Sequence, residues 1–273
     1  MKNFEASQAL RACCGVIYSL RKKMIESPQS FIVSTECNKA AEQNGFRRAL
    51  GETNGWAAFQ SSTAQGTIWL ASDQLSGQWF LALDHPGVIA ESGLLPSPIT
   101  GPGAARFSFD TYRAPYETLP TVYRLASSLP DAPLKLFDEA IKDLPRNTEA
   151  ERLAIQRVGQ DIFRKSLLEY WNGACPLTGI NDTALLRASH IIPWKDCRDD
   201  AERLNVHNGL LLSSLWDAAF DAGLVTFSTA GEPEFSTFLS DVARSSLQWT
   251  DPLILTHEHQ VRLEWHRISV FLR

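Results

Sequence analysis

Apolar residues recur every three or four positions in three parts of the chain, which is the spacing of one face of a helix. The first part runs from Phe4 to about Ile25, and the second covers residues 36–50. The third follows Thr148, a residue that can cap a first helical turn, and continues to about Trp171. The sequence therefore predicts a helix in each of these segments.

Three aromatic runs, separated by clusters of Ser, Gly and Asp, lie between the second helix and residue 84. The runs are Trp56–Gln60, Thr67–Ala71 and Trp79–Asp84. Such a series is typical of a small antiparallel sheet. Residues 85–120 are rich in Pro and Gly, so we expect a loop there, with one short strand at Arg106–Phe109. Helices and strands together predict a small α+β domain over residues 1–125.

A second domain is predicted after a connector over residues 126–147 that holds one short helix. Within residues 148–273, two short apolar runs at 184–192 and 209–212 precede a helix-compatible segment, Ser213–Phe220. Two strands followed by a helix form a β-β-α hairpin. The expected fold class is thus α+β, with a small N-terminal α+β domain and a C-terminal ββα domain that has flanking helices.

Composition and charge narrow the class of protein without identifying one. Of the 273 residues, 44% are hydrophobic and 21% are charged, as in a soluble globular protein. No apolar run approaches the roughly 20 residues that span a bilayer, so we expect no membrane partner and a cytoplasmic location. The five cysteines are odd in number and form no CxxC pair, which argues against a disulfide framework and against structural zinc. The net charge of −5 argues against a protein that coats nucleic acid through bulk electrostatics.

Polar residues with catalytic chemistry stand at the ends of the predicted β-β-α segments. His190 lies at the end of the first run, and Asn208 opens the second. Asp217 lies within the helix, with Asp221 one turn later on the same face. A neutral imidazole can take a proton from water near neutral pH, and an Asn in a turn can bind the backbone and fix a loop. A carboxylate on a helix is a hard oxygen ligand for a divalent ion.

The residues around these positions form an ordered set of motifs. They are Ala188-Ser189-His190-Ile191, Pro193-Trp194, Glu202-Arg203, Asn208-Gly209-Leu210-Leu211-Leu212 and Phe220-Asp221-Ala222-Gly223. This set resembles the HNH, or ββα-metal, endonuclease family, and it is particularly similar to a branch found in bacterial restriction-type proteins. Upstream and C-terminal motifs extend the resemblance over the last 125 residues or so, which makes the C-terminal domain an expected HNH nuclease domain.

The resemblance implies a role for each residue. His190 corresponds to the general base, and Asn208 to the residue that holds the loop of the base in place. Asp217 corresponds to the metal ligand on the helix, with Mg²⁺ or Mn²⁺ as the expected ion. Ser189 stands where many members carry a second ligand, Asp or His, so the complete ligand set stays open. Asp221 is a further candidate ligand, or a cap of the turn that follows it.

Polar residues near the hairpin are candidates for contacts with DNA. They are Arg203, Gln160, Arg164 and Lys195. Each could equally be an ordinary solvated or paired side chain, because charged residues usually occupy helix faces and loops. In the N-terminal half, the aromatic residues are expected to form the core of the small domain, and a pocket for a modified or flipped base is the alternative.

The resemblance thus implies a metal-dependent endonuclease that hydrolyses phosphodiester bonds of DNA, with restriction of foreign or modified DNA as the expected role. The expected partners are DNA and, in a homodimer, a second copy of the chain. Two other hypotheses stay open at this point. One is a nuclease for nicking or structure-selective repair, and the other is a catalytically silent HNH protein that only binds nucleic acid.

Overall fold

The computed structural model describes residues 25–73, 75–145 and 147–273, and the chain divides into two compact units. The first unit comprises the chain up to Gln60, Thr67–Asp84 and Leu94–Thr118. The second comprises Ser61–Gly66, His85–Gly93 and Leu119–Arg273. The sequence predicts a first domain that ends at residue 125. In the structure, two short segments of that region, Ser61–Gly66 and His85–Gly93, belong to the second unit. The helix predicted from Phe4 lies outside the described residues.

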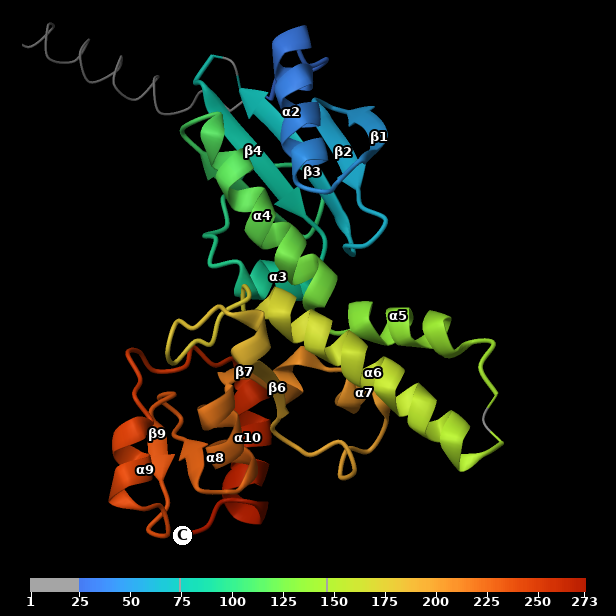
Figure 1. Cartoon of the computed structure of the whole chain (residues 1–273). Coiled ribbons are helices and arrows are strands. Elements are labelled where there is room, and N and C mark those ends of the chain that lie inside the picture. The colour runs from blue at the N-terminus through green and yellow to red at the C-terminus, as the bar shows by residue number, and fades with distance from the viewer. Residues whose placement is uncertain (1–24, 74, 146) are drawn as a thin grey trace, which may run out of the picture. The chain divides into compact units, whose positions relative to one another are not determined.

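The first unit is built on a five-stranded antiparallel sheet whose strands follow the order of the chain (Figure 1). The strands are β1 (Arg48–Thr53), β2 (Trp56–Gln60), β3 (Thr67–Asp73), β4 (Gln78–Leu83) and β5 (Ala105–Phe109). The four strands predicted from the sequence are confirmed. β1 was not predicted, but it forms a hairpin with β2 through Asn54 and Gly55, whose φ angles of 52° and 80° suit a two-residue turn.

One face of this sheet carries α2 (Phe31–Gln43), which buries Val33, Cys37, Ala40 and Ala41 (Figure 1). Ser30 caps the helix, since its hydroxyl accepts a hydrogen bond from the backbone N–H of Val33 at 3.4 Å. The helix predicted over residues 36–50 thus begins five residues earlier and ends at Gln43. Gly45, with a φ of 84°, follows the end of α2, and the chain then enters β1.

Residues 113–128, expected to be loop and connector, form the helix α4 (Arg113–Ser128) with Pro120 inside it. That prediction was wrong for a physical reason. A proline removes one helical hydrogen bond, but Leu119, Val122, Leu125 and Ala126 are all buried at helical spacing. The apolar surface that they bury outweighs the missing bond.

The second unit contains the remaining elements. Its helices are α3 (Pro86–Glu91), α5 (Ala132–Ile141), α6 (Glu149–Tyr170), α7 (Asp200–Arg203), α8 (Ser214–Asp221), α9 (Asp241–Ser246) and α10 (His257–Ser269), with short 3-10 turns η1 (Thr183–Leu185) and η2 (Val206–Asn208). Its strands are β6 (Leu186–His190) paired with β7 (Gly209–Ser213), and β8 (Val225–Phe227) paired with β9 (Pro233–Phe235). Strands and helices in both units confirm the α+β fold class.

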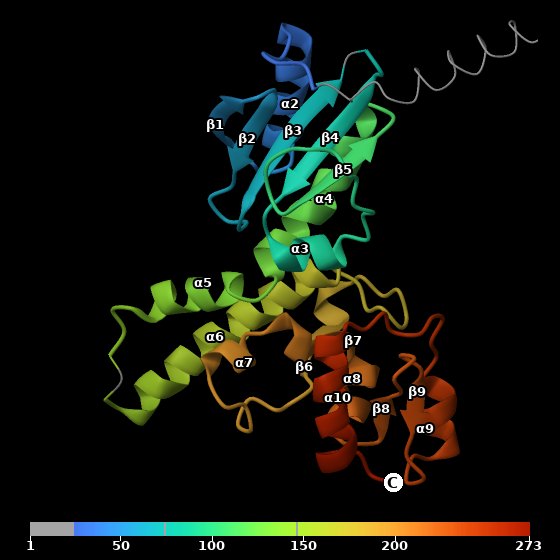
Figure 2. The ribbon, with the colours of Figure 1, turned by 180° about the vertical axis from the view of Figure 1, so that it is seen from behind.

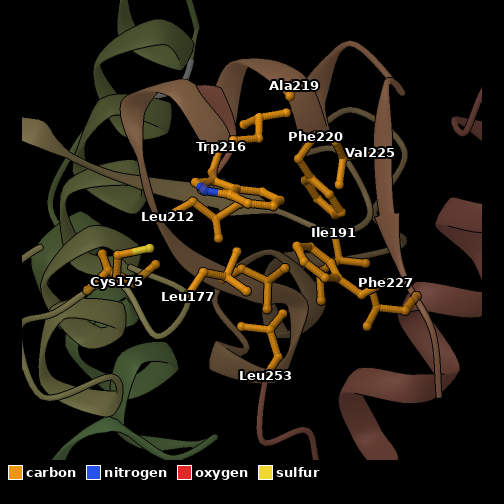
Figure 3. Packing of buried hydrophobic residues seen from close by; sticks show 14 of the residues in the cluster. Cys175, Leu177, Ile191, Leu212, Trp216, Ala219, Phe220, Val225, Phe227 and Leu253 are labelled. Atoms are coloured by element: carbon orange, nitrogen blue, oxygen red, sulfur yellow. The ribbon is translucent and has the colours of Figure 1, made fainter. Parts of the chain in front are cut away.

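A core centred on Trp216 holds the second unit together (Figure 3). The indole is 1% exposed, and its Nε1 donates a hydrogen bond to the carbonyl oxygen of Gln248 at 3.0 Å. Leu212 from β7 and Phe220 from α8 belong to the same cluster, so the strand and the helix that follows it share one core. Burial of aromatic residues of this size is a large stabilising contribution. Cys175 is buried in this core as a free thiol.

Among residues 25–273, apart from the two that are not described, no helix has the length and apolarity needed to cross a membrane.

Two histidines of α10 are buried as neutral side chains, and this predicts acid sensitivity. Burial is the main cause that lowers the pKa of His259 to about 3 and that of His266 to about 4. The unfolded chain, with a histidine pKa of about 6.5, therefore binds protons that the folded chain does not bind as the pH falls below 6.5. We expect the free energy of unfolding to be unaffected by these groups above pH 6.5 and to fall progressively between pH 6.5 and about 4.

The variant His266→Gln should reduce this loss by roughly 2 kcal/mol over the same pH range. Glutamine can keep hydrogen bonds to Thr226 and to the carbonyl oxygen of Phe220, the two partners of the imidazole. The exposed His257 provides the control, and His257→Gln should follow the wild type. Thermal unfolding measured at several pH values would contradict the prediction if His266→Gln and wild type lost stability in parallel.

Candidate active site

The β6–β7 hairpin and α8 bring the candidate residues together. In the antiparallel register, Ser189 lies opposite Leu210 and His190 lies opposite Gly209. α8 starts directly after β7, and its first turn places Asp217 beside β6. The hydroxyl of Ser189 donates a short hydrogen bond to the Oδ1 of Asp217, which ties the first strand to the helix.

Asn208 is completely buried and closes the loop that leads from β6 to β7. Its Oδ1 accepts a hydrogen bond from the backbone N–H of Ile192 at 2.9 Å, and its Nδ2 donates to the carbonyl oxygen of the same residue at 3.1 Å. Nδ2 also donates to the carbonyl oxygen of Glu202 and to the Sγ of Cys197, both at 3.3 Å. The amide therefore joins three points of the loop, at Ile192, Cys197 and Glu202.

His190 is held in one orientation and one tautomer. Its ring stacks on Phe163 of α6, with 3.8 Å between ring centroids, and meets the edge of Trp194. The Nε2 lies 2.9 Å from the carbonyl oxygen of Arg203. A carbonyl oxygen only accepts, so Nε2 carries the proton, and Nδ1 has no protein partner among the described residues. Burial lowers the pKa of His190 to about 4, against a smaller opposing effect of the carbonyl of Arg203. The imidazole is thus neutral near pH 7, with a lone pair on Nδ1 that can accept a proton.

Gly209 explains how Phe163 reaches the ring of His190. A Cβ at position 209 would lie 2.5 Å from the ring of Phe163 and 2.7 Å from a methyl carbon of Leu167. The strand partner of His190 must therefore lack a side chain so that α6 can pack against the hairpin. Gly159 of α6 leaves room in the same way for Trp194, whose ring would lie 2.6 Å from a Cβ there.

Two carboxylates, those of Asp217 and Asp221, lie one helical turn apart on α8, and the hydroxyl of Ser189 on the hairpin donates a hydrogen bond to the first of them. The pKa of Asp221 is raised to about 6, first by partial desolvation of its carboxyl group, although the residue as a whole is exposed, and then by the negative charge of Asp217. Among the described residues, no group of three or more His, Cys, Asp or Glu side chains is arranged to hold a metal ion. The donors present suit Mg²⁺, which binds one or two carboxylates and keeps several waters. Asp217, Asp221 and the hydroxyl of Ser189 fit such an ion.

A cavity of about 350 Å³ opens between β6, the loop after it and the end of α10. Ser189, His190, Trp194 and Asp221 are among its lining residues. The imidazole of His190 and the carboxylate of Asp221 on α8 thus line one concave surface. Ligand sites are generally concave in this way.

The four candidate DNA contacts are placed differently. Gln160 on α6 and Lys195 in the loop are exposed. The guanidinium of Arg164 donates to the carbonyl oxygens of Thr183 and Leu186, both at 2.9 Å. The guanidinium of Arg203 donates to the carbonyl oxygen of Trp194 at 3.1 Å and to Asp200 at 2.8 Å. Both arginines thus support the backbone of the site, and contact with DNA stays a prediction for all four.

Sequence reasoning missed a carboxylate that supports the hairpin from α3. Glu91 accepts hydrogen bonds from the Nε2 of His207 at 2.8 Å and from the hydroxyl of Tyr170 at 2.6 Å. Burial opposes ionisation of Glu91, but these hydrogen bonds lower its pKa overall. His207 directly precedes Asn208, so this contact steadies the residue that closes the loop. No local pattern near Glu91 signals it, because the partners are 79 and 116 positions away.

Asn208→Asp tests the role of the buried amide. The variant loses three donor contacts and places a carboxylate in a site that is 0% exposed, so we expect a loss of about 3 kcal/mol of stability. Asn205→Asp is the matched control, since the Oδ1 of Asn205 only accepts a hydrogen bond from the backbone N–H of His207, which a carboxylate also does. Equal thermal stability of the two variants would contradict this role of Asn208.

Comparison with known protein families bears on the same hairpin. Residues 175–228 match the HNH endonuclease family. A comparison with curated proteins gives no match. The matched span contains β6, β7 and α8, and thus every candidate catalytic and metal-binding residue, whereas α6 and α10 lie outside it. Residues 175–228, within the C-terminal half of the chain, are therefore similar to the HNH endonuclease family.

Proposed function

We propose that this domain is a divalent-metal-dependent endonuclease that hydrolyses phosphodiester bonds of DNA. The observation that carries the proposal is the single cavity onto which His190, Ser189 and Asp221 all open, with Asp217 hydrogen-bonded to Ser189. A base and an anionic oxygen cluster at one concave surface are the two parts that phosphodiester hydrolysis needs.

His190 acts as the general base. Its Nδ1 accepts a proton from a water molecule, and the oxygen of that water attacks the phosphorus. The bond from phosphorus to the 3′ oxygen breaks, and the leaving oxygen takes a proton from solvent. The products are a 5′-phosphate and a 3′-hydroxyl, the ends that the family resemblance implies. The carbonyl oxygen of Arg203 stabilises the imidazolium that forms, because it continues to accept the Nε2 proton. Phe163 keeps the ring at the angle that this transfer requires.

Asp217 would hold the metal ion, with the hydroxyl of Ser189 and the carboxylate of Asp221 as further oxygen donors. The bound ion, Mg²⁺ or Mn²⁺, supplies positive charge to the scissile phosphate and to the leaving oxygen. Ser189 orients the carboxylate of Asp217 through its hydrogen bond. The positive charge of an ion bound to Asp217 and Asp221 would also lower the raised pKa of Asp221 toward its ordinary value.

The biological role that we propose is restriction of foreign or modified DNA in the cytoplasm. The described part of one chain carries one such site, so a cut through both strands needs either a homodimer or two successive nicks. Cleavage of supercoiled plasmid separates these cases, because nicked circles accumulate before linear product when the strands are cut singly. Persistent nicked circles would instead favour the nicking or repair nuclease.

The variant His190→Ala tests the base. Cleavage of plasmid DNA with Mg²⁺ or Mn²⁺ should fall at least about 100-fold, while the chain stays folded and DNA binding changes little, because water activation is lost and the phosphate contacts remain. His257→Ala, at an exposed position of α10, is the control and should cleave as wild type. Cleavage by His190→Ala within a few-fold of wild type contradicts the assignment. No cleavage by the wild-type chain supports the silent HNH protein.

Asp217→Asn tests the metal site. Removing the charge should weaken Mn²⁺ binding, measured by electron paramagnetic resonance of the free ion, and reduce cleavage in parallel. Asp241→Asn on the exposed first turn of α9 is the control. If Asp221→Asn abolishes Mn²⁺ binding and Asp217→Asn does not, the principal metal ligand is Asp221 and the assignment of Asp217 is wrong. A crystal structure with Mn²⁺ should place Asp217 at roughly 2.0–2.6 Å from the ion.

A further inference from the structure

The two faces of the five-stranded sheet differ in how they are covered. The register places Phe59, Leu70 and Leu81 on the face that carries α2, and these residues are buried in the core. It places Trp56 and Trp69 on the opposite face, because Trp69 pairs with Ala58 and Ala58 lies two positions after Trp56. Among the described residues, no helix lies on that face. Figure 2 shows the loop before β5 crossing it instead.

A cavity of about 620 Å³ lies on this second face, and the two tryptophans form part of its wall. The loop before β5 forms another part through Thr100, Gly101 and Pro102. Gly101 touches the indole of Trp56 so closely that a Cβ would lie 2.5 Å from a ring carbon. Trp56, at 3% exposed, is therefore a fixed wall, whereas Trp69 is only half-buried and presents its ring to the cavity.

The loop itself is anchored to the sheet. The Nη1 of Arg106 donates to the carbonyl oxygen of Gly103 at 2.9 Å, and the backbone N–H of Ser97 donates to the carbonyl oxygen of Arg106 at 2.7 Å. Ile99 packs into the cluster formed by Trp56, Ala71 and Phe80. The walls of the cavity are thus preformed, which reduces the entropy lost when a ligand binds.

The chemistry of the walls limits what the cavity can take. None of the described lining residues is charged, so the ligand group that enters is neutral. Two indoles favour a flat ring. Asn54, Thr53, Ser27 and Thr100 add an amide and three hydroxyls that can donate and accept hydrogen bonds at the edge of that ring. A flat neutral ring with donors and acceptors along its edge is the chemistry of a nucleobase.

We propose that this cavity binds one unstacked nucleobase of DNA, held against Trp69 and read at its edge by Asn54. The choice of DNA as the ligand rests on the proposed function of the C-terminal half. The cavity and the chemistry of its walls are observed independently of that function. The first unit would then have a binding function of its own. Its affinity for a DNA would depend on how easily one base leaves the base stack of that DNA.

The experiment measures binding of the full chain, in EDTA, to a duplex that carries 2-aminopurine opposite an abasic site. The fluorescence of this base reports whether it is stacked. We expect quenching on binding, with affinity about ten-fold lower for Trp69→Ala, the usual loss when one base–aromatic stack is removed. Trp69→Phe should restore most of the affinity, and Trp69→Leu, which is apolar but has no π face, should not.

Trp79→Ala is the matched control, because Trp79 is a half-buried tryptophan of the same sheet that the register places on the other face. It should bind as wild type. Equal affinity of Trp69→Ala and wild type overturns the proposal, and so does an equal loss in Trp79→Ala. Displacement of the probe by methyl glucoside but not by adenosine would assign the cavity to sugars and also overturn it.

The same variants separate this proposal from the nuclease. If His190→Ala cleaves normally but Trp69→Ala loses probe binding, the catalytic assignment fails and the base-binding cavity stands. If cleavage depends on His190 while probe binding is indifferent to Trp69, only the cavity proposal fails.

Discussion

The side-chain amide of Asn208 is the contact on which the geometry of the active site depends. The loop between β6 and β7 must leave the hairpin, turn through α7 and return, and its polar backbone groups need partners where water is excluded. One buried amide supplies three of these contacts, to the N–H and carbonyl oxygen of Ile192 and to the carbonyl oxygen of Glu202, and it also donates to the Sγ of Cys197. An aspartate or leucine of similar size cannot both donate and accept in this way. The contact therefore constrains the residue type, and not merely its size or polarity.

This constraint extends to the ring of His190. Because the loop is closed, the carbonyl oxygen of Arg203 lies where the Nε2 of His190 can donate to it. Phe163 then fills the space beneath the ring, and Gly209 makes that space available. The same burial that orients the ring also lowers its pKa to about 4. Orientation and neutrality thus have one physical cause, and a nuclease that uses this base would be insensitive to protonation of His190 near pH 7.

The sequence predicted the parts of this arrangement that local patterns encode. Aromatic runs between turn clusters predicted β2 to β4, and a short run in the Pro- and Gly-rich segment predicted β5. The two apolar runs and the segment after them predicted β6, β7 and α8. The sequence did not predict α4, where the signal of Pro120 obscured buried positions at helical spacing. Nor could it predict Phe163 beneath His190, or Glu91 beside His207, because those contacts join residues far apart in the sequence. They depend on how α6 and α3 pack, and packing has no signature in one short segment.

Ser189 stands where the resemblance leads one to expect Asp or His, and under the proposed function this affects how strongly the site would hold a metal ion. A hydroxyl adds no charge, so the cluster carries the charge of Asp217 and, above a pH of about 6, that of Asp221. Fewer carboxylates mean less repulsion between ligands in the absence of metal, but also weaker attraction for a divalent ion. Under the proposed function, the scissile phosphate must then supply part of the missing negative charge. Metal and DNA would bind cooperatively, and each would be held weakly without the other.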